Sequence, residues 1–260
     1  MVGLAVRLQN YLREKALFDG RTQVHVPPFT LFFDPTVIDS REGIAIPDEA
    51  AAYSADDVGR MCAAFIERGR LPCVQYLDAF APGLTITLQL GVTDFEETTR
   101  LPVMYCTAGM LVHPPQVSAL EIKMSSSESP LDEVKDGWNV NSLGFDKESI
   151  PATDAVADAF RKTLITSRAF VSYAAGKPAA AGMFTEIRDG ITELVGITTL
   201  PEYRRQGIGA ALTANMTRAA FDSGVEVAFL IAANDAAERV YERLGFRKVA
   251  KLLEYQQKTD

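Results

Sequence analysis

Residues 199 to 209 read Thr-Leu-Pro-Glu-Tyr-Arg-Arg-Gln-Gly-Ile-Gly, and this stretch decides the fold. It joins the end of an apolar, strand-like run to the start of a helical pattern through a basic turn. Such a turn can direct backbone N–H groups, a positive helix end and guanidinium charge toward one anion. Gly207 and Gly209 have no Cβ, so the main chain can approach that anion closely. We therefore expect a ligand with a pyrophosphate to bind here.

The spacing of this turn differs from the common nucleotide motifs. Arg204-x-x-Gly207-x-Gly209 matches neither the Gly-x-x-x-x-Gly-Lys pattern of a P-loop nor a full Gly-x-Gly-x-x-Gly fingerprint. No motif that would support a magnesium–nucleotide complex accompanies it. A Walker-type nucleotide-binding protein is therefore disfavoured.

Length and composition limit the class of protein. At 260 residues the chain is long for one domain and favours two, and a hydrophobic content of 47% supplies a core. The net charge of -8 argues against nucleic-acid binding, which needs a basic face. No run of about 20 apolar residues predicts a membrane segment. Three widely spaced cysteines and two histidines predict reduced thiols, no metal centre and a cytoplasmic location.

The clearest candidate domain boundary lies at residues 112–116, Val-His-Pro-Pro-Gln, because prolines lack N–H donors and resist both helix and central strand. The sequence thus predicts two domains, residues 1–115 and 116–260. Residues 90–97 faintly echo residues 244–248, as a duplicated domain would. Ser54 can cap a helix. In the first domain the patterns predict helices at residues 1–18, 56–67 and 84–90, and strands at 73–77 and 95–106.

The second half reads as an antiparallel meander followed by alternating helices and strands. Asp189-Gly190 separates two apolar runs and predicts a type I′ hairpin, in which both residues adopt positive φ. Asn234 can cap a helix that Gly245 ends. The expected elements are strand 120–124, helices 130–138 and 152–167, strands 170–173, 179–187 and 191–199, helix 207–222, strand 225–232, helix 235–244 and strand 246–255.

This order resembles the acyl-CoA-dependent N-acyltransferases of the GNAT superfamily over roughly residues 118 to 256. Residues 204–209, Arg-Arg-Gln-Gly-Ile-Gly, fit the family's (Arg/Gln)-x-x-Gly-x-(Gly/Ala) signature. Residues 234–246 fit its Asn-x-x-Ala-x-x-x-Tyr-x-x-x-Gly-Phe pattern. The resemblance implies an α/β fold of the α+β type with a mixed sheet, the GNAT fold, in tandem. Residues 116–260 would be the catalytic domain and residues 1–115 a degenerate GNAT-like domain.

The resemblance implies acetyl-CoA as co-substrate and no metal. The pantetheine arm would pair, strand-like, with the main chain of Ile197, Thr198 and Thr199. Asn234 would contact that arm, although by itself it is also an ordinary helix cap. The pyrophosphate would be held by a set of consecutive residues in the turn: Arg204, Arg205, Gln206, Gly207, Ile208, Gly209 and Ala210.

Two residues are the candidate catalytic groups. Tyr241 would face the CoA sulfur as general acid, and Glu193 is the candidate general base because some GNAT members carry a glutamate at a similar place. Without the resemblance, Tyr241 is a core residue and Glu193 a solvated strand residue, and water could accept the proton instead. Period-two alternation places Glu193 on the same face as Val195, Ile197 and Thr199 if no bulge intervenes.

The predicted function is an N-acetyltransferase that acts on a primary amine by direct attack in a ternary complex, since no Ser/His/Asp or Cys/His set is visible. The alternative is a non-catalytic module that binds or senses acyl-CoA. The expected partners are a small-molecule or peptide amine, with no nucleic acid and no membrane, and the protein would be a monomer or homodimer. The resemblance places the acceptor cleft near residues 138–145 and 246–255.

Overall fold

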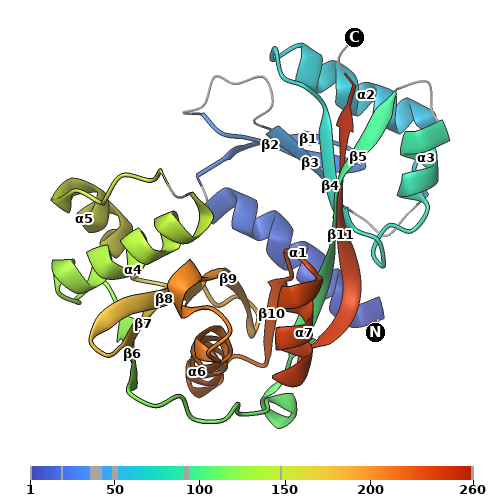
Figure 1. Cartoon of the computed structure of the whole chain (residues 1–260). Helices are drawn as coiled ribbons and strands as arrows, with labels where there is room; N and C mark the ends of the chain where they lie inside the picture. Colours follow the sequence, from blue (N-terminus) through green and yellow to red (C-terminus); the bar gives the residue numbers. More distant parts are fainter. Residues whose placement is uncertain are drawn as a thin grey trace. The chain divides into compact units, whose positions relative to one another are not determined.

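The structure is a computed structural model that describes residues 2–18, 20–35, 43–48, 52–90, 94–146 and 148–258. By its internal contacts the chain divides into two compact units. Unit 1 comprises Met1–Val103 and Lys248–Asp260, and unit 2 comprises Met104–Arg247. Figure 1 shows the elements of both units, coloured along the chain.

Unit 1 is a mixed sheet with three helices. Strands β1, β2 and β3 pair antiparallel, β3 pairs parallel with β4, and β4 pairs antiparallel with the last strand, β11. Its core contains fully buried aromatic rings such as Phe32, Phe65 and Tyr76. The elements are α1 (Val2–Phe18), β1 (Thr22–Val26), β2 (Phe29–Phe33), β3 (Gly43–Pro47), α2 (Ala55–Ile66), β4 (Cys73–Leu77), α3 (Leu84–Leu90), β5 (Phe95–Cys106) and β11 (Arg247–Gln257).

Unit 2 is an antiparallel meander, β6 to β9, followed by β10, which pairs parallel with β9. Helix α4 lies on one face of these strands and α6 on the other (Figure 1). The elements are η1 (Ala108–Met110), β6 (Leu120–Ser125), α4 (Leu131–Phe145), α5 (Asp154–Thr163), β7 (Arg168–Ala174), β8 (Lys177–Phe184), β9 (Ile191–Thr199), η2 (Pro201–Tyr203), α6 (Ile208–Asp222), β10 (Val227–Ile231) and α7 (Asp235–Arg243).

Local signals explain why several elements begin and end where they do. Asp189 and Gly190 both have positive φ, at 47° and 70°, and Arg188 and Ile191 exchange backbone hydrogen bonds across them, which confirms the predicted hairpin. The predicted helix caps are also confirmed: Ser54 and Asn234 accept from backbone N–H groups at the starts of α2 and α7. Gly245 has φ 97°, and a Cβ there would lie 1.9 Å from the Met110 carbonyl oxygen, so only glycine fits.

Three strands were not predicted from the sequence. The stretch that forms β1 and β2 is interrupted by Pro27-Pro28, which lies in the connecting turn, and β3 follows at residues 43–47. With these strands, unit 1 repeats the order that unit 2 shows from β7 onward: three antiparallel strands, a helix, a parallel strand and another helix. Of the weak sequence echo, residues 91–93 lie outside the described residues.

The compact units differ from the predicted division at residues 115 and 116. Residues 104–115 cluster with unit 2, where Val112 N donates to the Leu244 carbonyl at 2.9 Å. The last strand clusters with unit 1, because Leu252–Gln256 pair with Cys73–Leu77. The structure therefore assigns β11 to the sheet of the first unit, and the division into sequence domains 1–115 and 116–260 stays a prediction.

Candidate functional site

The basic turn between β9 and α6 has the backbone geometry of an anion site. After η2, Arg205 and Gly207 adopt left-handed conformations at φ 61° and 82°. Gly207 is the N-cap of α6, and no side chain caps the helix there. The first helical hydrogen bond runs from Ala211 N to Gly207 O at 2.9 Å. The N–H groups of residues 208–210 therefore have no acceptor within the helix and point from its positive end.

Close packing explains why this turn needs two glycines. A Cβ on Gly209 would lie 3.0 Å from Thr199 Oγ1, and a Cβ on Gly207 would lie 3.3 Å from Val117 Cγ2. At Gly207 the positive φ adds a conformational requirement. The Gly-x-Gly spacing thus lets α6 begin directly against the end of β9.

A cleft of about 360 Å³ opens at this helix end, and it is strongly basic. Arg204, Arg205 and Arg243 line it, and none of its lining side chains is acidic. Guanidinium groups beside unpaired helix N–H groups provide charge-assisted hydrogen bonds to a phosphate. The other lining residues are Thr199, Tyr203, Gly207, Ile208, Gly209, Ala210 and Val240.

Most of the predicted turn residues meet in this cleft, with one exception and one addition. Gln206 donates from Nε2 to the Glu202 carbonyl at 3.0 Å and lines a neighbouring cleft of about 560 Å³ instead. Arg243 lines both clefts and was not predicted. Arg243 follows Tyr241 by two positions at the end of α7. Its position beside the second motif was the feature of the sequence that could have identified it.

Strand β9 parts from β10 after Glu193, well before the turn. β10 pairs with β9 only through Val227–Phe229 opposite Ile191–Glu193. The rest of β9, Leu194–Thr199, extends past this pairing, so its main chain on that side can receive an extended ligand. The Thr199 carbonyl already accepts from Arg204 Nε at 2.9 Å. This hydrogen bond occupies the carbonyl of one of the three residues predicted to pair with pantetheine. It does not involve the other two, Ile197 and Thr198.

A β-bulge in β9 corrects the predicted face of Glu193. Met183 pairs with Val195, whereas Ala181 pairs with Thr198, so β9 contains one extra residue between these pairs. Gly196 lies there with φ 64°. Ile197 consequently packs with the core under α6, and Thr199 approaches Gly209 of α6. The prediction that these two residues share the face of Glu193 required a strand without a bulge, and the bulge removes that condition.

Glu193 instead shares the α4 face with Val195, since no register shift separates them. Only 4% of its surface is exposed, so the alternative of a solvated strand residue is wrong. Its backbone is fixed by Thr185, whose N–H donates to the Glu193 carbonyl at 2.9 Å. Beyond the bulge, Thr198 returns to this face, where a Cβ on Gly144 of α4 would overlap its side chain.

The second motif lies on α7. Asn234 uses Oδ1 to accept from Ala237 N at 3.0 Å, so the expected cap is confirmed and its amide nitrogen is the group that could donate to a ligand. Tyr241 is 8% exposed and belongs to the core of unit 2, with its ring centroid 6.0 Å from that of Phe246. Burial raises the pKa of Tyr241 to about 12, so its hydroxyl remains protonated near neutral pH.

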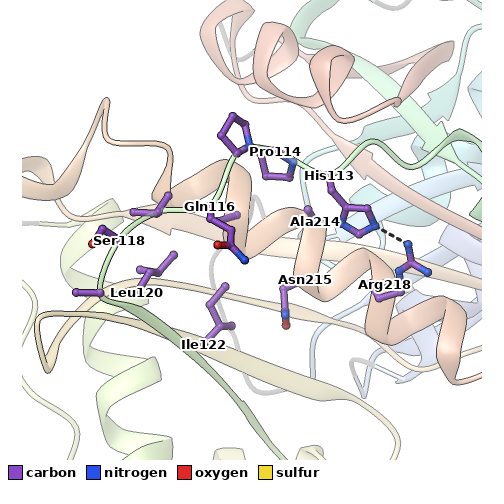
Figure 2. A pocket seen from close by; sticks show the side chains of 13 residues that line it. His113, Pro114, Gln116, Ser118, Leu120, Ile122, Ala214, Asn215 and Arg218 are labelled. Carbon is purple, nitrogen blue, oxygen red and sulfur yellow. Dashed lines mark hydrogen bonds between the residues drawn. The ribbon is translucent and has the colours of Figure 1, made fainter.

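A wider groove of about 940 Å³ runs between residues 113–120 and α6. Figure 2 shows His113 turned toward Arg218, with a hydrogen bond between Arg218 and His113 Nε2. None of the predicted site residues lines this groove. Volume alone therefore does not single out a candidate site; the smaller cleft is the one at which helix N–H groups and arginines converge.

The described part of the chain offers neither a metal site nor a membrane-spanning helix. There, no group of three or more His, Cys, Asp or Glu residues could hold a metal ion. No helix among the described residues has the length and apolar content to cross a bilayer. Cys62, Cys73 and Cys106 are free and buried, and burial raises the pKa of the Cys62 and Cys106 thiols to about 11.

Comparison with known proteins places this geometry in a family. The model of the Acetyltransferase (GNAT) family matches residues 141–246, which include the turn, Asn234 and Tyr241. An uncharacterized N-acetyltransferase, YjcF, from Bacillus subtilis (strain 168) is 27% identical over 121 residues, which are 46% of this chain and 82% of that protein.

Two solved structures extend the similarity in fold to nearly the whole chain. A GCN5-related N-acetyltransferase from Kribbella flavida aligns with a TM-score of 0.78 at 22% identity, over 98% of this chain and 96% of that one. A tandem GNAT protein from the clavulanic acid biosynthesis pathway aligns with a TM-score of 0.63 at 10% identity, over 89% and 79%.

Residues 141–246 therefore belong to the GNAT acetyltransferase family. The predicted α/β fold with a mixed sheet is confirmed, as is the similarity to tandem members. Family membership suggests an acetyltransferase and implies the use of acetyl-CoA.

Proposed function

We propose that unit 2 transfers an acetyl group from acetyl-CoA to a primary amine by direct attack in a ternary complex. The observation that carries this proposal is the uncapped start of α6, where the N–H groups of residues 208–210 meet Arg204, Arg205 and Arg243 in one cleft. The diphosphate of CoA supplies the matching anion. Each charge-assisted hydrogen bond contributes about 1.5–3 kcal/mol.

The pantetheine arm would follow the part of β9 that β10 leaves unpaired. It would run from the turn past Thr198 and Ile197 toward the bulge at Gly196. In this arrangement the thioester arrives where β9 and β10 part, next to Glu193. Asn234 could donate to the arm from its amide nitrogen, because its Oδ1 is used by the helix cap.

The chemical step forms a C–N bond and breaks the C–S bond of the thioester. The neutral amine attacks the carbonyl carbon, its proton passes to a base, and CoA leaves as a thiolate that must be stabilised. Glu193, buried on the α4 face, is the proposed base, directly or through a water. A pH–rate comparison of the Glu193→Gln variant with wild type tests this role.

Tyr241 is the proposed donor to the departing sulfur. Because burial raises its pKa to about 12, well above the value of about 8.5 for an ordinary thiol, full proton transfer to the thiolate is unfavourable. The hydroxyl therefore acts chiefly as a hydrogen-bond donor that stabilises the developing negative charge. The raised pKa of the Cys106 thiol, about 11, keeps it protonated and disfavours an acyl-enzyme on that residue.

Binding of acetyl-CoA to a Gly207→Asp variant tests the anion site. The aspartate would place negative charge at the start of α6, and the loss of about 2 kcal/mol predicts about 30-fold weaker binding by calorimetry. Gly224→Asp is the matched control, because Gly224 also has positive φ, at 90°, but lies after the other end of α6 in open space. If a folded Gly207→Asp protein binds as tightly as wild type, the proposal fails.

The non-catalytic alternative predicts binding without turnover. Release of free thiol from acetyl-CoA in the presence of a panel of amines separates the two. The burial of Glu193 and Tyr241 in the same unit as the cleft favours the enzyme. The acceptor, a small-molecule or peptide amine, and the oligomeric state of monomer or homodimer stay predictions.

A further inference from the structure

A further cavity in unit 2, of about 190 Å³, shares no residue with the basic cleft. It lies between α4, α5 and the strands β7 to β9, on the face that carries Val195. It reaches β9 at Val195 and Gly196, beside the bulge. The lining residues are Gly137, Trp138, Asn141, Phe160, Ala169, Phe170, Ala181, Gly182, Met183, Val195 and Gly196.

The cavity exists because small residues stand where larger ones would close it. Gly137 lies inside α4, and a Cβ there would only touch Val171 at 3.9 Å. On the strand side, Ala169 and Ala181 have short side chains that leave the space open. Opposite them Trp138 and Phe160 form a wall, packed edge to face at 5.1 Å. Since protein interiors are close-packed, an apolar space of this size is suited to a ligand group.

The chemistry of the lining selects what can enter. No charged side chain contributes to it. One N–H of the Asn141 amide already donates to the Gly196 carbonyl, so the polar capacity of the lining is small. A charged group placed here would lose its hydration without gaining an ionic partner, which is costly. The occupant is therefore uncharged and largely apolar.

The size of the cavity indicates whether it holds part of the acceptor amine or the acyl group. An apolar cavity of about 150 Å³ holds one benzene molecule, so about 190 Å³ accommodates a single aromatic ring or a branched aliphatic group. The methyl of an acetyl group would leave most of this space empty. The occupant is then part of the amine.

We infer that the acceptor is an amine with a compact, uncharged apolar group, and that this group fills the cavity while the amino group lies at the β9 bulge near Glu193. This inference rests on the proposed function. Trp138 and Asn141 fall within residues 138–145, the first of the two regions predicted for the acceptor. Lys248–Tyr255 of the second region belong to unit 1.

Gly137→Leu tests the inference, because it fills the cavity while replacing a helical glycine with a better helix former. Gly59→Leu is the matched control: Gly59 is also helical, in α2, with nothing within 4 Å of its Cβ position. Wild type and both variants are compared in acetylation of 2-phenylethylamine, 3-methylbutylamine and 1,4-diaminobutane. Binding of acetyl-CoA and of 2-phenylethylamine is measured by calorimetry in parallel.

Wild type and Gly59→Leu should show at least about tenfold higher kcat/KM for the two apolar amines than for the diamine. Gly137→Leu should lose most of that preference and most binding of 2-phenylethylamine, with binding of acetyl-CoA unchanged. Preference for the diamine, or unaltered selection and binding in Gly137→Leu, overturns the inference. The same reactions are run with butyryl-CoA in place of acetyl-CoA; a loss in Gly137→Leu that appears only with butyryl-CoA, with amine selection intact, also overturns the inference by assigning the cavity to the acyl chain.

The failure of the proposed function gives a different result. If the protein binds no acetyl-CoA, the proposed function fails. If acetyl-CoA binds but 2-phenylethylamine neither binds nor reacts, the inference alone is overturned.

Discussion

Replacing Tyr241 with phenylalanine isolates the contribution of one hydroxyl group. The ring is 8% exposed and packs 6.0 Å from the ring of Phe246, and phenylalanine retains that packing. We therefore expect the free energy of unfolding at neutral pH to change by less than about 1 kcal/mol. Because the pKa of Tyr241 is raised to about 12, wild type keeps its hydroxyl proton across the usual assay range. A loss of activity would then report the hydroxyl and not its ionisation.

The expected size of that loss follows from the proposed hydrogen bond to the leaving thiolate. A hydrogen bond to a charged group is worth about 1.5–3 kcal/mol, and about 1.4 kcal/mol corresponds to a tenfold change in rate. The chemical step should therefore slow about 10- to 150-fold, so a loss near 10²-fold is expected. The sulfur gains charge only as the C–S bond breaks, so the affinity for acetyl-CoA should remain unchanged.

The assay is single-turnover release of free CoA thiol with saturating amine, combined with calorimetric binding of acetyl-CoA. Tyr173→Phe is the control, because the Tyr173 hydroxyl donates to Asp136 Oδ2 at 2.9 Å and lines none of the clefts described above. That variant should lose about 1 kcal/mol of stability and keep its rate. An unchanged chemical step in Tyr241→Phe, or an equal loss in both variants, would refute the reasoning.

Three further outcomes are expected. In the pH profile of kcat/KM, Glu193→Gln should lose the acidic limb of wild type, and a limb that persists would assign the ionisation to another group. Arg243→Ala should weaken acetyl-CoA binding about tenfold but leave acetyl-pantetheine, which lacks the phosphates, nearly unaffected; equal losses for both ligands would contradict a phosphate contact. Finally, unfolded tyrosine ionises near pH 10 and folded Tyr241 near 12. The stability that the protonated phenol contributes is present below pH 10 and is lost as pH rises to 12. In urea unfolding, the free energy of unfolding of wild type should therefore fall by about 2–3 kcal/mol more than that of Tyr241→Phe over this range. An equal fall in both proteins would argue against burial of the phenol.

Features set by neighbouring residues could be predicted from the sequence. The Asp189-Gly190 hairpin and the Asn234 cap depend on residues a few positions apart, and both are confirmed. The turn at residues 204–210 is likewise contiguous, so its glycines and arginines were found together. The roles proposed for these residues toward acetyl-CoA stay predictions.

Features set by distant pairing could not be predicted. The bulge at Gly196 depends on the register between β8 and β9, and it reverses the side on which Ile197 lies. Arg243 reaches the basic cleft only because α7 packs beside the start of α6. The assignment of β11 depends on pairing with β4, more than a hundred residues earlier in the chain. In each case the deciding contact joins segments that no local pattern connects.

Helices α2 and α6 hold equivalent places in the order of the two units, but they begin differently. In each unit the helix follows three consecutive antiparallel strands, β1–β3 or β7–β9, and leads to a parallel one. At α2, however, Ser54 accepts from Asp57 N, and Asp57 accepts from the Ser54 backbone, which together form a capping box. The Ser54 N–H also holds the pKa of Asp57 below its ordinary value, so a carboxylate stays charged at that helix end. At α6, in contrast, no side chain caps the helix at Gly207, so its first N–H groups are open to the phosphate proposed above.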